Sequence, residues 1–138
     1  MSQPLDALIG EWTTEATHPA FPGVVGGRAV AEWLEGEHFL ILRSHAHHAD
    51  APDSIAIIGP PGEGASTLAM FFFDSRGVHR VYETSIDNGV WKVWRDAPGF
   101  SQRFVGSFEG NDAISGLWQL SRDGSTWNDD LRITYRRV

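Results

Sequence analysis

The sequence has no cysteine and almost no lysine, and each absence excludes a class of chemistry. Without cysteine the chain can form neither disulfide bonds nor thiolate metal sites, and it has no cysteine nucleophile. Lys92 is the only lysine among 11 basic residues, and the formal net charge is -7. Nucleic acid and anionic membranes bind to basic surfaces, so this charge argues against both as partners.

Long apolar runs are also missing. No stretch approaches the roughly 18 apolar residues that a membrane-spanning helix needs. Residues 1–10 carry Asp6 and no long apolar run, which is not typical of a signal peptide. We therefore expect a cytoplasmic protein. We also expect residues 1–138 to form one domain, because this length suits a single core.

The sequence is rich in aromatic residues and in alternating patterns. Six Trp and eight Phe fill either a packed core or the wall of a ligand cavity. Residues 4–9 predict a short helical turn, and period-two alternation then predicts ten strands. These strands span residues 11–18, 28–35, 38–45, 54–58, 67–74, 79–86, 90–95, 101–108, 113–120 and 127–136. Such a meander avoids exposed edges by closing, so we predict an all-β fold, a closed antiparallel up-and-down barrel.

One turn predicts which side chains of the central hairpin point into the barrel. Asn88-Gly89 suits a two-residue turn, which sets the register of the two strands around it. Lys92 and Glu83 then mark the solvent side. The predicted inward side holds Tyr82, Thr84, Ile86, Trp91, Val93 and Arg95.

The last hairpins are predicted in the same way. Asp123-Gly124 suits a two-residue turn that places Trp118 opposite Asp129 on an inward face, which continues through Leu131 and Ile133 to Tyr135. For the hairpin before it, we choose a three-residue loop at residues 110–112 over a two-residue loop. The shorter loop would turn Phe100, Phe104 and Phe108 away from the face of Trp118. Gln102 then points inward as well.

The second and third strands allow two interpretations. In one, the interior is lined by Trp33, Leu40 and Leu42. In the other, it is lined by Leu34, Phe39, Ile41 and Arg43. The sequence leaves both open.

The two ends of the chain carry the motif of a known superfamily of barrels. Gly10-Glu11-Trp12 opens the first predicted strand, and Arg136 and Arg137 lie at the end of the chain. This arrangement resembles the G-x-W signature of calycins, the superfamily of lipocalins and fatty-acid-binding proteins. The resemblance implies that Trp12 closes one end of the barrel and that Arg136 or Arg137 packs over it.

Three stretches resemble a family of small uncharacterised bacterial proteins that is assigned a lipocalin-like barrel. They are residues 73–78 (FDSRGV), 94–104 (WRDAPGFSQRF) and 123–127 (DGSTW). The resemblance covers nearly the whole chain. Because that family has no settled activity, the resemblance supports the fold and adds little about function.

The organisation resembles nitrobindin, a ten-stranded calycin that binds haem, more than it resembles the fatty-acid-binding proteins. Fatty-acid-binding proteins insert two lid helices where this chain has a short Pro/Gly-rich loop at residues 19–27. Nitrobindin binds haem iron through a His near its C-terminus, but here no His follows His79, and the last strand offers only Tyr135 as an axial ligand. Haem binding is therefore an alternative, and we expect no cofactor.

Several polar groups fall on the predicted inward faces among aromatic residues. Buried charge needs a partner, so Arg95 either pairs internally with Asp129 or anchors the polar end of an amphipathic ligand. The predicted ligand-binding residues are Tyr82, Trp91, Arg95, Gln102, Phe104, Trp118 and Asp129. An enzyme with Tyr82, Arg95 and Asp129 as acid–base groups is a weaker hypothesis, because no motif supports it.

Two other groups of polar residues have simpler interpretations. His45, His47 and His48 lie where a predicted strand ends, and two of them share a face, but no third metal ligand follows at a suitable spacing. We interpret this cluster as a solvated loop end and predict no metal site. Asp74-Ser75-Arg76 precedes a glycine and is typical of a turn.

The leading hypothesis is a protein that binds a small, largely apolar or amphipathic molecule inside a barrel. An aromatic interior with a few inward polar groups is typical of such sites. The alternatives are a haem protein of the nitrobindin type and a barrel that acts through its surface. A homodimer stays open.

Overall fold

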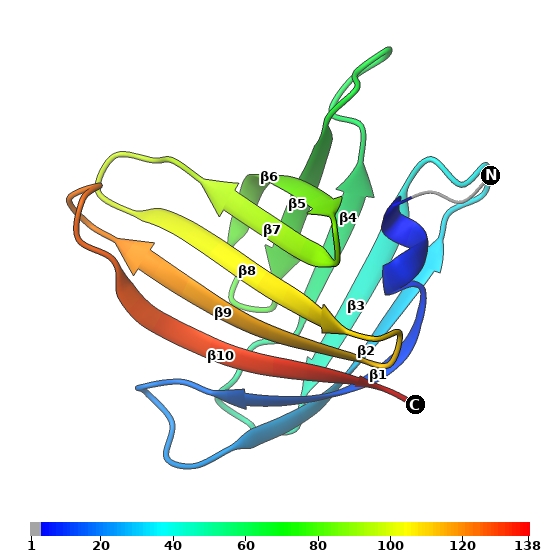
Figure 1. Ribbon diagram of the computed structural model, residues 1–138. Helices are drawn as coiled ribbons and strands as arrows, with labels where there is room; N and C mark the ends of the chain where they lie inside the picture. The colour runs from blue at the N-terminus through cyan, green and yellow to red at the C-terminus, as the bar shows by residue number, and fades with distance from the viewer. Residues whose placement is uncertain (1–3) are drawn as a thin grey trace.

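The computed structural model describes residues 4–138 and shows a closed barrel of ten antiparallel strands (Figure 1). Each strand pairs with the next along the chain, and β1 closes the barrel by pairing with β10. The strands are β1 (Gly10–Thr17), β2 (Val25–Trp33), β3 (Leu40–Ala46), β4 (Ser54–Gly59), β5 (Leu68–Asp74), β6 (His79–Asp87), β7 (Val90–Arg95), β8 (Ser101–Glu109), β9 (Ala113–Ser121) and β10 (Asn128–Arg137). The predicted fold class is confirmed, with strand bounds that differ by a few residues.

A single turn of helix lies at one end of the barrel (Figure 1). It is the 3₁₀ helix η1 (Pro4–Leu8), where the sequence predicts a short helical turn. Leu5 and Leu8 are buried, so η1 forms part of the core at this end. No helix within residues 4–138 is both long and apolar enough to span a membrane.

The central hairpins have the registers that the turns predict. On β6 and β7, Ile86 pairs with Trp91 and Thr84 with Val93. The three-residue loop at 110–112 is confirmed, and it places Phe104 opposite Trp118. For the second and third strands, the interpretation with Leu40 and Leu42 inside is correct, because both side chains are buried.

The predicted register of the last hairpin is wrong along the whole hairpin, by one residue before a bulge in β10 and by two residues after it. Asp123 accepts hydrogen bonds from the backbone N–H groups of Ser125 and Thr126 at 2.8 and 2.7 Å. This stabilises a wider loop at residues 122–127 in place of the predicted two-residue turn. The Trp127 side chain does not line the cavity. It packs against Arg103, whose guanidinium carbon lies 4.0 Å from the centroid of the Trp127 ring.

A β-bulge between Asp129 and Leu131 then changes the face on which β10 side chains lie. Asp129 pairs with Gln119 instead of Trp118, and its exposed carboxylate accepts hydrogen bonds from Gln119 and Arg132. Asp130 lines the interior in its place. After the bulge, Leu131 pairs with Trp118, so the rest of the strand keeps its predicted inward face.

Candidate functional site

An internal cavity opens at the end of the barrel opposite η1. Its volume is about 540 Å³, within the range of roughly 300–1,000 Å³ that is usual for small-molecule sites. The segments that follow β1, β3 and β5 contribute residues to its mouth, among them His18, Phe21, Pro52 and Arg76. The strands line the rest of the cavity.

One wall of the cavity is aromatic. Tyr82, Trp118, Phe104, Trp91 and Tyr135 line it and come from the five strands β6–β10. Their rings contact one another in that order, with centroid separations of 5.6, 5.1, 5.0 and 6.2 Å. Edge-to-face and tilted contacts of this kind are favourable, so the rings form one continuous surface.

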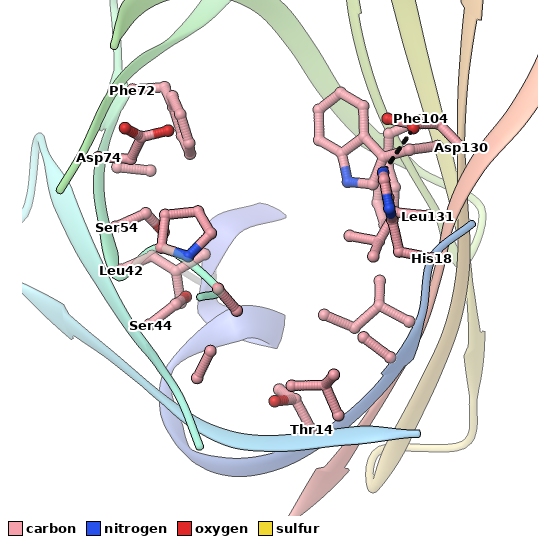
Figure 2. Close-up of a pocket in the computed structure, with 18 of the residues that line it drawn as sticks. Thr14, His18, Leu42, Ser44, Ser54, Phe72, Asp74, Phe104, Asp130 and Leu131 are labelled. Carbon is pink, nitrogen blue, oxygen red and sulfur yellow. Dashed lines mark hydrogen bonds and ion pairs between the residues drawn. The ribbon is translucent and has the colours of Figure 1, made fainter. Parts of the chain in front are cut away.

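The opposite wall consists mostly of small side chains. Strands β1–β4 contribute Leu42 and the smaller residues Thr14, Ala16, Val25, Gly26, Ser44, Ala46, Ser54 and Ala56, and the adjoining β5 contributes Met70 and Phe72. Figure 2 shows Ser44 and Ser54 across the cavity from Phe104 and Leu131. Small residues on one side and large rings on the other leave an open space between the two walls.

Trp12 lies at the end of the barrel that η1 covers. Its side chain is 2% exposed, and its indole N–H donates a hydrogen bond to the Leu8 carbonyl at 2.9 Å. The Arg137 guanidinium carbon lies 4.1 Å from the centroid of the Trp12 ring. Arg137, and not Arg136, is therefore the terminal arginine that packs over this tryptophan.

The glycine of the G-x-W motif makes this contact possible. Arg137 donates hydrogen bonds to the carbonyl oxygens of Ile9 and Ala7, so its guanidinium lies against the backbone. Gly10 has a φ of 130°, and a Cβ at this position would collide with the Arg137 guanidinium. Glycine tolerates this φ and leaves the required space.

A buried polar pair lies on the aromatic wall. The Tyr82 hydroxyl donates a hydrogen bond to Gln102 Oε1 at 3.0 Å, and both side chains are buried. Burial raises the pKa of Tyr82, and the nearby guanidinium groups of Arg80 and Arg95 offset part of that rise. Two arginines therefore approach this pair.

Arg80 is the arginine beside this pair that lines the cavity. It lies on β6 two residues before Tyr82, so the two side chains share the inward face. Its half-buried guanidinium lies 5.2 Å from the centroid of the Phe100 ring. No carboxylate forms an ion pair with Arg80 within residues 4–138. Because a guanidinium stays charged, Arg80 presents positive charge to the cavity.

Asp74, the carboxylate whose charge acts on Tyr82, is already paired with Arg76. The Asp74 side chain is fully enclosed and accepts hydrogen bonds from Arg76 Nη2 and Nε at 2.6 and 3.1 Å. Although burial raises the pKa of Asp74, the hydrogen bonds from Arg76 and Val78 hold it below its ordinary value. Three guanidinium groups and one carboxylate thus surround Tyr82, a local excess of positive charge in an acidic protein.

A histidine and an aspartate join two strands at the mouth (Figure 2). His18 Nδ1 accepts a hydrogen bond from the Ala20 N–H, so the ring proton lies on Nε2. Nε2 donates it to Asp130 at 2.9 Å. Both ring nitrogens are therefore engaged, and the pair links the end of β1 to the bulge of β10.

The hydroxyl of Tyr135 lies deep in the barrel. The Tyr135 ring contacts Trp12 and Trp91, with centroid separations of 6.3 and 6.2 Å. Burial raises the pKa of Tyr135 to about 12. The hydroxyl has no hydrogen-bond partner in the part of the chain that the structure describes, and the residue keeps some accessible surface because the cavity reaches it.

The two tyrosines of the chain, Tyr82 and Tyr135, give a pH prediction. Both pKa values are raised above 10.0, so the folded protein should form little tyrosinate at pH 10, and Tyr135 should ionise near pH 12. In the unfolded chain both tyrosines lose their protons at a lower pH than in the folded protein. The contribution of these two tyrosines to the free energy of unfolding should therefore be fully present below about pH 10 and should be lost as the pH rises toward 12. Absorbance titration of folded and urea-unfolded protein checks this; equal curves would contradict it.

Five of the predicted ligand-binding residues line the cavity. They are Tyr82, Trp91, Gln102, Phe104 and Trp118. Arg95 does not line it; its guanidinium instead donates to the Phe100 carbonyl at 3.3 Å. Asp129 lies outside the barrel, so the predicted pair with Arg95 does not form.

Sequence reasoning missed Arg80 and Asp130 as cavity residues. Arg80 could have been found, because it alternates with the inward residues Tyr82 and Thr84 on the same strand. Asp130 points inward because of the β-bulge, and no pattern in the sequence predicts that bulge. Tyr135 was predicted on the inward face, but nothing indicated that its hydroxyl would lack a partner.

The histidine cluster lies at the rim. His45 Nδ1 lies 2.9 Å from Asp53 Oδ1, and the His45 and His47 rings contact each other at 5.3 Å. His48 is also exposed, and its ring contacts Phe21 at 4.8 Å. Within residues 4–138 no three potential ligands are grouped closely enough to hold a metal ion.

Comparison with solved structures finds this fold in other barrels. Rv2717c from M. tuberculosis, known from a crystal structure, matches with a TM-score of 0.69 and 14% identity over 100% of this chain and 99% of that chain. A de novo designed fluorescence-activating β-barrel matches with a TM-score of 0.53 and 11% identity over 100% of both chains. No family model and no curated protein matches the sequence. At these identities the likeness shows the fold alone.

Proposed function

We propose that this protein binds a small, largely apolar molecule with an acidic end inside its barrel. The observation that carries the proposal is the half-buried Arg80, which lines an aromatic cavity without a carboxylate partner in the described chain. A partly buried cation is costly unless an anion or hydrogen-bond acceptor compensates it. A ligand carboxylate would supply that compensation.

The shape of the cavity supports the same proposal. About 540 Å³ of space is lined on one side by aromatic rings, which favours an apolar ligand body. This volume also argues against a fully packed barrel that acts through its surface alone. The designed barrel, described as fluorescence-activating, shares the fold. The contact between Trp12 and Arg137 agrees with the calycin resemblance, and we include a calycin relationship in the proposal.

Haem is the alternative ligand that the nitrobindin resemblance implies. Haem iron needs an axial ligand, most often a histidine. His18 lines the cavity, but both of its ring nitrogens are engaged, by Ala20 and Asp130. His45 lies at the rim with Nδ1 close to Asp53. These contacts favour the apolar acid over haem.

Replacing Arg80 with glutamine tests the charge. Calorimetry would compare naphthoic acid with its methyl ester, which has the same rings and no charge. The change Arg80→Gln should weaken binding of the acid about 10- to 100-fold, as expected for a hydrogen bond to a charged group. The ester should lose much less, since it never paired with the guanidinium.

The matched control is Arg122→Gln, which removes the same charge from an exposed loop position. It should bind both probes as the wild type does. Equal losses for acid and ester in Arg80→Gln would remove Arg80 as the anchor of the acidic end. Absence of binding for both probes in the wild type would contradict the proposed function itself.

A further inference from the structure

The aromatic wall joins two polar groups at different depths. Arg80 and Tyr82 lie on β6, and Arg80 is close to the strand end nearer the mouth. From Tyr82, four successive ring contacts lead to Tyr135. Tyr135 in turn contacts Trp12, which lies at the end covered by η1. The Tyr135 hydroxyl is therefore a deep polar group of the cavity, beside Thr14, with which Tyr135 pairs on the neighbouring strand.

The Tyr135 hydroxyl is open to the cavity and is not sealed in the packed core, because no buried side-chain N or O atom within residues 4–138 lacks a partner. A ligand that fills the cavity would remove this hydroxyl from water, so the ligand would have to supply a hydrogen-bond partner. Within residues 4–138 the Tyr82 hydroxyl has Gln102, whereas the Tyr135 hydroxyl has no partner. A phenol can both donate and accept a hydrogen bond, so Tyr135 can pair with a ligand hydroxyl or carbonyl.

The two walls also restrict ligand shape. The rings of Trp91, Phe104 and Trp118 line one side, and small residues such as Ser44 and Ala56 line the other. Figure 2 shows Phe104 on one side of an open space and Ser44 on the other, with Phe72 on the side of Ser44. A flat ring system can stack or contact edge-on along such a row of aromatic groups.

We infer that the ligand is a planar aromatic acid with a hydroxyl or carbonyl group at the end farthest from its carboxylate. This inference rests on the proposed function and specifies its ligand class. The carboxylate pairs with Arg80, the rings lie along the aromatic wall, and the distal group exchanges a hydrogen bond with Tyr135. Tyr135 is thus a specificity-determining residue.

The test compares naphthoic acid with a hydroxynaphthoic acid whose hydroxyl is on the ring far from the carboxylate. By calorimetry the wild type should bind the hydroxylated acid about two- to tenfold more tightly, the effect of one neutral hydrogen bond. In Tyr135→Phe this preference should disappear. The control Thr13→Val removes a hydroxyl from the exposed face of the adjoining strand and should keep the wild-type preference.

The outcomes separate this inference from the proposed function. If both acids bind and Arg80→Gln weakens both, but Tyr135→Phe leaves the preference intact, the role of Tyr135 is wrong. If a straight-chain fatty acid binds more tightly than either naphthoic acid, the planar ligand class is wrong. If neither naphthoic acid nor the fatty acid binds, the proposed function fails and this inference fails with it.

Discussion

Replacing Trp12 with alanine should destabilise the folded protein by about 3–5 kcal/mol, the usual cost of removing a large aromatic side chain from a core. Trp12 is 2% exposed, contacts the Tyr135 ring and donates a hydrogen bond to the Leu8 carbonyl. Its loss would leave a void beneath η1 and remove the ring on which Arg137 packs. Urea denaturation of wild type and variant measures the change in free energy of unfolding.

The control is the same substitution at Trp94. Trp94 pairs with Glu83 and Arg103 on the outer face, and its side chain is only partly buried. Removing it should cost clearly less, about 1 kcal/mol, which is typical of a substitution away from the core. A loss below about 1 kcal/mol for Trp12→Ala would mean that Trp12 and Arg137 do not stabilise this end of the barrel.

The parts of the fold that could be predicted depend on interactions between close neighbours in the sequence. Asn88-Gly89 fixes its hairpin because a two-residue turn requires backbone conformations that these residues adopt, and the observed φ values of both are positive. Once the register is known, alternation places Tyr82 and Trp91 inside. The closed barrel follows because every strand needs a partner on each side.

The parts that could not be predicted depend on competition between alternative local structures. Asp123-Gly124 has the composition of a two-residue turn, but the Asp123 carboxylate gains two backbone N–H bonds by forming a wider loop. The bulge after Asp129 then brings Asp130 to the interior. A one-residue irregularity exchanges the two faces of a strand, so the predicted acid was one position from the observed one.

In the candidate site, too, one feature could be predicted from the sequence and another could not. The aromatic lining was predictable because large apolar side chains alternate along strands, as Phe104 and Trp118 do on adjacent strands. Whether these rings fill the interior was not predictable. It depends on what faces them, and Gly106 and Gly116 leave space that the Phe104 ring occupies, whereas the small residues of β1–β4 leave space open. The cavity thus results from packing between distant strands.

The change Ser44→Trp should greatly weaken ligand binding while leaving the barrel folded. Ser44 lies on β3 and lines the cavity opposite the aromatic wall (Figure 2). A side chain added there enters about 540 Å³ of open space, so it should not force the strands apart. The added indole would lie where the ligand rings lie. We expect Ser44→Trp to weaken binding of naphthoic acid more than about 100-fold, a change of about 3 kcal/mol.

The control is Ser107→Trp, because Ser107 is also a strand serine but its side chain is exposed on the outer face of β8. This variant adds the same group to the surface and should bind naphthoic acid with wild-type affinity. Urea denaturation shows whether both variants stay folded, which separates a filled cavity from a disrupted barrel. If folded Ser44→Trp still binds naphthoic acid within about threefold of the wild type, the ligand does not occupy the space between the two walls. Binding would then have to be sought on the outer surface of the barrel.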